Sequence, residues 1–125
     1  MPLDGMLIHE ESGDGYTFWF YQVELRNILL IMVSDNPDGI PGLGNIALCA
    51  IARIPHARYT SGTIPMGNAK YDVLSRSVAE ILSRKLESPV VLFLDVHFEP
   101  TDAKIVRKLK IAVNKFTERQ EDGKE

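Results

Sequence analysis

The sequence predicts one α+β domain, in which a mostly antiparallel sheet of about six strands, as one layer or folded into a sandwich, packs against two helices. Three observations lead to this fold class. Extended apolar and aromatic segments fill the first half of the chain, a helical period begins near Lys70, and one apolar run separates this helix from a second. Strands joined by short turns favour antiparallel pairing. No linker divides the chain, so residues 1–125 are expected to form a single domain with a frayed tail over residues 118–125.

The first two expected strands cover residues 6–11 and 16–25, on either side of a Ser-Gly-Asp-Gly turn signal at residues 12–15. The second strand is rich in aromatic and β-branched residues, and the alternation of its side chains defines two faces. One face carries Trp19, Tyr21, Val23 and Leu25, and the other carries Tyr16, Phe18, Phe20 and Gln22.

Three more strands are expected over residues 28–33, 46–52 and 58–66. Residues 28–33 are apolar at every position, which is typical of a strand covered on both faces. Residues 36–42 contain two prolines and two glycines and are expected to form a loop. The expected strand over residues 46–52 is followed by Pro55, which marks the end of the extended segment. A helix is also compatible with these residues, because periodicity does not distinguish a helix from a strand in a short apolar run.

A helical period covers residues 70–87, with Asn68 as the expected N-cap and Pro89 as the stop. An apolar strand is expected over residues 90–94, and the last helix comes after Pro100 with Thr101 as its expected cap. Each helix presents one apolar stripe to the sheet. The stripes are Tyr71, Leu74, Val78, Ile81 and Leu82 in the first helix, and Ile105, Leu109, Ala112 and Phe116, flanked by Val106 and Val113, in the second.

The composition is that of an ordinary globular domain, with 45% hydrophobic and 25% charged residues. The net charge of −3 gives no global attraction to nucleic acid or to an anionic membrane. Cys49 is the single cysteine, so a disulfide within the chain is excluded and a small buried side chain is expected. Because neither a signal peptide nor a membrane span is recognisable, we expect a cytoplasmic or nuclear protein.

Two patterns invite an enzymatic interpretation. Residues 42–47 match the dinucleotide fingerprint G-x-G-x-x-A, but the segment that continues from this motif resembles a strand rather than a helix, so a loop is favoured. Asp95 and His97 share one face of a strand end, and with Glu99 they define an alternative function as a small α+β enzyme or ligand-binding domain. An activated nucleophile is not recognisable, and His9, His56 and His97 lack metal-site spacing, so no catalytic residue, cofactor or metal is expected.

Two further features indicate binding to another protein. The last helix carries a basic outer half around one apolar residue, which is typical of a solvated face but also resembles a small interface for an acidic protein surface. RNA is a weaker alternative partner, because no aromatic residues are interleaved with these cations. The second strand places large rings on both faces of the sheet, so one set needs a second layer or a partner. The candidate partner-binding residues are Phe18, Trp19, Phe20, Tyr21, Lys104, Arg107, Lys108, Ile111 and Lys115.

The order of these segments resembles a known family. The apolar run 28–33, the Asn-Ile-Ala-Leu-Cys-Ala run at 45–50, the Thr-rich run 59–68 that closes on Gly67 and Asn68, the helix with Leu74 and residues 78–82, and the strand 89–94 are together similar to the proteasome assembly chaperones. The similarity covers residues 18–117 and lies mostly in hydrophobic pattern. The chain departs from the family in its proline-rich loop 36–44 and at Pro65.

The resemblance implies a non-enzymatic protein without cofactors. It implies a dimer with a second small chaperone, formed through the sheets, and binding of the dimer to an α-type proteasome subunit during assembly of the α-ring. On this basis the aromatic strand is expected to supply the dimer interface, and the basic face of the last helix is expected to be available to the proteasome subunit.

Overall fold

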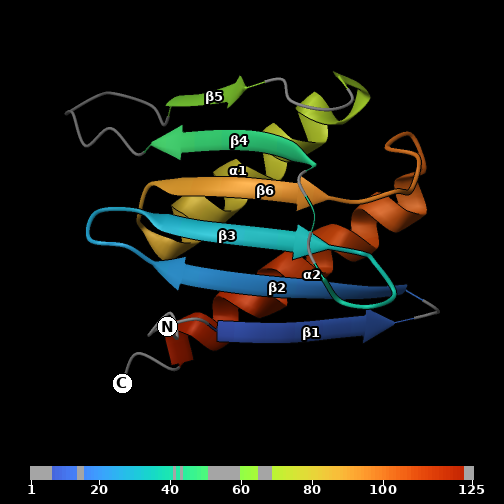
Figure 1. The fold of residues 1–125 in the computed structure, drawn as a ribbon, viewed down its shortest axis with the longest axis horizontal. Helices are drawn as coiled ribbons and strands as arrows, with labels where there is room; N and C mark the ends of the chain where they lie inside the picture. The colour runs from blue at the N-terminus through green and yellow to red at the C-terminus, as the bar shows by residue number, and fades with distance from the viewer. Residues whose placement is uncertain are drawn as a thin grey trace.

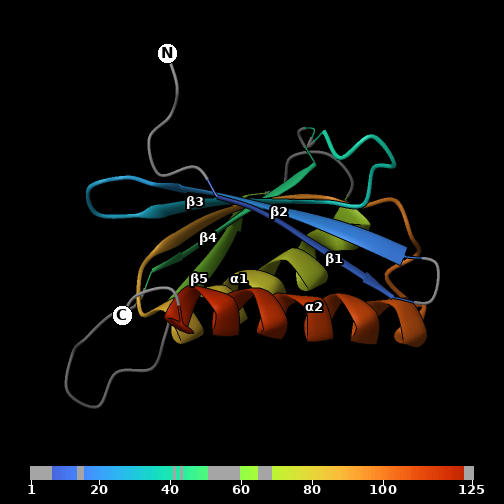
Figure 2. The same cartoon turned by 90° about the horizontal axis from the view of Figure 1, so that it is seen from below.

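The computed structural model describes residues 7–13, 16–40, 42, 44–50, 60–64 and 69–122. Their strands form one six-stranded sheet in the order β1-β2-β3-β6-β4-β5, and α1 and α2 both lie on one face of it (Figures 1 and 2). The class is α+β, as predicted, and the described strands make a single sheet, not a sandwich. The elements are β1 (Leu7–Gly13), β2 (Tyr16–Glu24), β3 (Leu29–Ser34), β4 (Asn45–Ala50), β5 (Thr60–Ile64), α1 (Asp72–Leu86), β6 (Val90–Asp95) and α2 (Ala103–Asp122).

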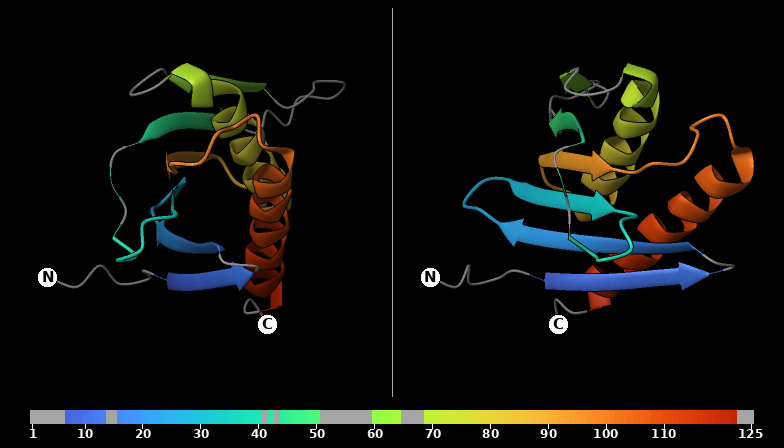
Figure 3. Two further views of the ribbon diagram at one scale, coloured as in Figure 1. Left: turned by 90° about the vertical axis from the view of Figure 1, so that its right-hand side faces the viewer. Right: turned by 45° about the vertical axis from the view of Figure 1, so that its right-hand side comes forward.

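The sheet is antiparallel except at its centre, where β3 and β6 run parallel. The expectation that consecutive strands pair is wrong for β3 and β4, because β6 lies between them. The two strands that are apolar almost throughout therefore take the central positions, where both edges are hydrogen-bonded by neighbours. A view along the sheet shows two layers, with strands on one side and helices on the other (Figure 3).

Strand β2 places alternate aromatic side chains on opposite faces, as predicted. Phe18 and Phe20 are 2% and 0% exposed, and the ring of Phe20 stacks on Phe116 of α2 with centroids 4.9 Å apart. Phe18 meets Phe98 edge-on at 6.4 Å. Both phenylalanines are therefore core residues on the face that carries the helices, which corrects the expectation that they contribute to a partner-binding surface.

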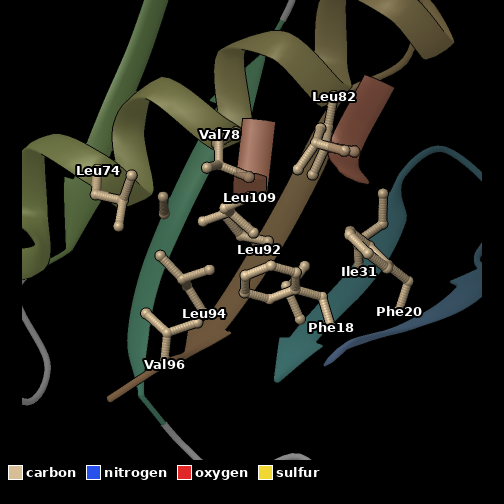
Figure 4. Close-up of a cluster of buried hydrophobic side chains, with 14 of the residues drawn as sticks. Phe18, Phe20, Ile31, Leu74, Val78, Leu82, Leu92, Leu94, Val96 and Leu109 are labelled. Atoms are coloured by element: carbon tan, nitrogen blue, oxygen red, sulfur yellow. The ribbon is translucent and has the colours of Figure 1, made fainter. Parts of the chain in front are cut away.

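The core fills the space between the sheet and the two helices (Figure 4). Leu92 and Leu94 of β6 are buried under Val78 and Leu82 of α1 and Leu109 of α2. Burying one such side chain stabilises the fold by about 1.5–3 kcal/mol. Strand β3 departs from its prediction, because only alternate residues are fully buried, and its second face is not covered by a helix.

Helix α1 comes after one turn of 3-10 helix, Ala69–Tyr71. The predicted stripe is confirmed: Tyr71, Leu74, Val78 and Leu82 are buried, and Ile81 is partly buried against them. The helix ends at Glu87, which adopts a left-handed conformation with φ 51°. The predicted cap Asn68 and the segments 14–15, 51–59 and 65–67 lie outside the described residues.

Helix α2 buries its predicted stripe, but its two ends differ from expectation. The N-cap is Asp102, not Thr101, because the Asp102 carboxylate accepts hydrogen bonds from the backbone N–H groups of Lys104 at 3.1 Å and Ile105 at 3.5 Å. At the other end, the helix continues to Asp122, so most of the tail that was expected to fray is helical.

Candidate functional site

The sheet face opposite the helices carries an apolar patch. Register places two rows of three side chains across β3, β6 and β4, the three neighbouring strands at its centre. We call these six residues the open-face patch: Met32, Phe93 and Ile46 in one row, and Leu30, Val91 and Leu48 in the other.

The open-face patch is not covered by either helix (Figure 2). Five of its side chains are half-buried, and Leu48 is 39% exposed. A contiguous apolar surface of this kind on a folded domain marks a site for another protein or a ligand. Because the patch lies on a twisted sheet, a second apolar sheet face of matching twist would fit it well.

A loop between β3 and β4 limits the open-face patch at one end (Figure 1). The Tyr21 hydroxyl donates a hydrogen bond to the carbonyl of Gly39. Burial raises the pKa of this hydroxyl, and the charge of Asp38 adds a smaller effect in the same direction. Gly39 has φ +75°, and a Cβ there would lie 3.0 Å from the Trp19 ring. Trp19 and Tyr21 thus lie on the expected face of the sheet, but this loop covers part of their surface.

Asp95, at the end of β6, anchors the loop to the sheet. Its Oδ2 accepts hydrogen bonds from the Asn36 side chain at 2.7 Å and from the backbone N–H of Gly42 at 2.8 Å. Asn36 also donates to the carbonyl of Ile40 at 2.9 Å. These bonds tie both halves of the loop to one carboxylate.

His97 lies beside Asp95, as predicted, but its main partner is Asp35. Nδ1 of His97 is 2.8 Å from Asp35 Oδ1, and Nε2 is 3.5 Å from Asp95 Oδ1. The hydrogen bond to Asp35 is the largest cause of a raised pKa of His97, and the charges of Asp35 and Asp95 act in the same direction. Both ring nitrogens face carboxylates, whereas a general base needs one nitrogen free for a nucleophile. Glu99, the third predicted member, pairs instead with Lys70 at 3.1 Å.

The glycines of the fingerprint at residues 42–47 have a packing role. A Cβ on Gly44 would lie 2.0 Å from the carbonyl oxygen of Leu94, so glycine lets β4 begin in close contact with β6. The motif leads into β4, so the helix N-terminus that would hold a pyrophosphate is replaced by a strand. The loop interpretation is therefore confirmed.

Other candidate ligand groups do not assemble. No metal-binding cluster occurs in the parts of the chain that the structure describes, and no described helix is long and apolar enough to cross a membrane. Cys49 is 1% exposed, and burial raises the pKa of its thiol, so it is the small core residue that was expected. His56 lies outside the described residues.

The predicted basic residues of α2 do come together on its outer face. Lys104, Arg107, Lys108 and Ala103 line an open hollow with Ile111, whose side chain is 47% exposed. The ammonium group of Lys108 lies 5.2 Å from the centre of the Tyr16 ring. Lys115 is exposed one turn beyond Ile111.

Sequence reasoning missed the open-face patch and Asp35. The patch draws two residues from each of three strands, and it becomes visible only when β6 is known to lie between β3 and β4. Asp35 directly follows one central strand, just as Asp95 ends the other. Parallel strands end at the same edge of a sheet. A parallel pairing of these two strands would therefore have predicted, from the sequence, that the two acids lie close together.

The fold and the open-face patch together define a class: a single-sheet α+β domain with one sheet face under two helices and an opposite face whose apolar centre no described helix covers. No known family model matches the sequence, and no curated protein matches it. In fold, the chain is similar to a chain in the crystal structure of a chaperone complex for yeast 20S proteasome assembly, with a TM-score of 0.69 at 8% sequence identity. The match covers 97% of this chain and 98% of that chain, so the likeness extends over the whole fold.

Proposed function

We propose that this protein is a non-enzymatic assembly chaperone that dimerises with a second small chaperone and binds an α-type proteasome subunit, promoting assembly of the 20S α-ring. The observation that carries the proposal is the open-face patch, six apolar side chains on the sheet face opposite the helices. The whole-chain likeness to a chain from a proteasome assembly chaperone complex supports it. We further propose that, of the two small proteasome assembly chaperones, its counterpart is chaperone 4 rather than chaperone 3.

The interface that we propose differs from the one the sequence suggested. Phe18 and Phe20 are committed to the core, and the loop at Gly39 lies on Trp19 and Tyr21. The dimer contact is therefore centred on β3, β6 and β4, with β2 at its rim. Fully buried apolar side chains at the middle of an interface supply most of its affinity.

A strand-end enzyme is the weaker alternative. Asp95 is engaged by the loop, and His97 is held between two carboxylates, so both groups already have structural roles. The proposal consequently assigns no catalytic residue and no cofactor. The proposed function agrees with the expected location in the cytoplasm and nucleus, which fluorescence of a tagged chain would test.

The test is co-expression with a second small proteasome assembly chaperone and each α-type proteasome subunit, followed by size exclusion with light scattering. We expect a dimer that retains one α-type subunit, and Phe93→Glu should abolish the dimer because it places a charge in the centre of the apolar contact. Val73→Glu is the matched control, since Val73 is 81% exposed on α1 and far from the open-face patch. A lone stable monomer that ignores every α-type subunit would contradict the proposal.

The same experiment separates a homodimer from a heterodimer. The chain alone is measured first, over a range of concentrations, and then mixed with the second chaperone. If the chain alone forms a dimer, and addition of the second chaperone converts it into the mixed dimer, the open-face patch would form the contact in both dimers.

A further inference from the structure

Charge is unevenly distributed along this chain. Residues 103–117 of α2 contain five of the 14 lysines and arginines and none of the 17 aspartates and glutamates. Their formal charge is +5, so the remaining residues carry nine cations against 17 acids, a charge of −8. The net charge of −3 therefore hides one strongly basic helix on an acidic protein.

The basic residues share one side of α2. Lys104, Arg107, Lys108 and Ile111 are spaced by three and four residues, so they form neighbouring positions on the outer surface of the helix. The opposite side holds the buried stripe that packs on the sheet, so this face points away from the protein (Figure 2). We call Lys104, Arg107, Lys108, Ile111 and Lys115 the α2 basic patch.

Part of this charge is not neutralised by the residues that the structure describes. On α1, Arg76 pairs with Glu80 one turn away at 3.6 Å. On α2, the side chains of Lys104 and Arg107 make no ion pair with any described residue. Cations three and four residues apart repel each other, and cations near a helix N-terminus oppose the helix dipole. A bound anion would relieve both effects.

The centre of the α2 basic patch is apolar. Ile111 lies in the hollow between the cations and is 47% exposed. An apolar centre inside a charged rim is the arrangement of a small protein interface. Single-stranded nucleic acid is bound instead through aromatic side chains on which bases stack, and the exposed residues of the patch include no aromatic ring.

We propose that the α2 basic patch is a docking site for an acidic segment of a partner protein, with one apolar side chain of that segment seated on Ile111. Lys104 and Arg107 pair with carboxylates of the segment, and Lys108 and Lys115 extend the positive rim. The identity of the partner as an α-type proteasome subunit rests on the proposed function, but the preference for an acidic segment does not. The patch lies across the molecule from the open-face patch, so both sites can be occupied together (Figure 2).

The probe is a fluorescein-labelled helical peptide of glutamates with leucines at helical spacing, measured by fluorescence anisotropy over a salt series. We expect binding that weakens with salt, and a loss of at least about tenfold in affinity for the double variant Lys104→Glu/Arg107→Glu. This variant should remain folded, because acids in the first turns of a helix suit its dipole. Ile111→Ser should weaken binding while leaving the salt dependence unchanged.

The matched control is Arg26→Glu/Lys85→Glu, which changes the net charge equally at two exposed cations outside the patch. Equal losses in the two double variants, or no binding by the unmodified chain, would overturn the proposal. Tighter binding of an oligothymidylate of equal charge through the same residues would replace it with a nucleic-acid site. Light scattering on the same samples reports dimerisation, so failure of the docking site and failure of the chaperone function are distinguished.

Discussion

The two faces of the sheet are made from alternate residues of the same strands, yet they meet different surroundings. On one face, Phe20 of β2 and Leu92 of β6 are 0% exposed beneath the helices. On the other, the neighbours Tyr21 and Phe93 are only half-buried, although they are also large aromatic residues. The difference indicates that the apolar side chains of the second face are not needed to complete the fold. That face is therefore available for another molecule.

The largest expected effect concerns the covered face. Phe20→Ala removes a ring that stacks on Phe116, and we expect it to lower the free energy of unfolding by about 3–5 kcal/mol in urea denaturation. Phe93→Ala, measured on the monomer at high dilution, is the matched substitution on the open face and should cost clearly less. Equal losses of unfolding free energy in the two variants would mean that the two faces contribute equally to stability.

The next effect concerns association. We expect Phe93→Ala to weaken the proposed dimer by about 2 kcal/mol, because an aromatic side chain at the centre of an interface is a typical hot spot. Analytical ultracentrifugation over a concentration series measures the dissociation constant directly. A dissociation constant equal to that of the unmodified chain would move the interface away from the open-face patch.

A smaller effect is expected at the rim, where the loop meets the sheet. Tyr21→Phe removes the hydroxyl that donates to the Gly39 carbonyl, and we expect a loss of about 1 kcal/mol in unfolding free energy. Hydrogen exchange at residues 36–40 is the direct measurement, and exchange there should become faster while the core stays unchanged. Uniform acceleration throughout the protein would instead indicate general destabilisation.

The smallest expected effect is a pH dependence at the anchor of the loop. Asp35 and Asp95 raise the pKa of His97, so the protonated imidazole stabilises the folded state below the unfolded pKa of about 6.5, and this contribution is lost as pH rises through the raised value. Unfolding free energies of the unmodified chain and of His97→Gln should therefore converge as pH increases above this window. Identical pH profiles for the two proteins would show that the carboxylates do not act on His97.

Local patterns in the sequence predicted much of this fold. The alternation in β2 and the stripes of α1 and α2 are set by periods of two and about 3.6 residues, which the chain carries regardless of its neighbours. The cap of α2 was missed by one residue, because Thr101 and Asp102 are both good capping residues and only geometry shows which carboxylate or hydroxyl reaches the free N–H groups.

The candidate site was harder to predict, because it depends on pairing between distant segments. The aromatic pattern of β2 suggests an interface, but Phe20 packs on Phe116 of α2 and Phe18 packs on Phe98, so both rings belong to the core. The open-face patch needs β6 to enter between β3 and β4, which no local period specifies. The basic residues of α2, in contrast, were found from sequence since all of them lie on one helix.

The central position of β6 also has a consequence for synthesis of the protein. Strand β6, residues 90–95, lies between β3 and β4 and joins the two halves of the sheet. Until these residues have left the ribosome, a nascent chain holds the two halves unconnected. Pairings this far apart in sequence form late in folding. Val91 and Phe93 belong to that same late strand, so the open-face patch, the proposed partner surface, is complete only when the centre of the sheet closes. Incompletely translated chains would therefore be unable to recruit a partner.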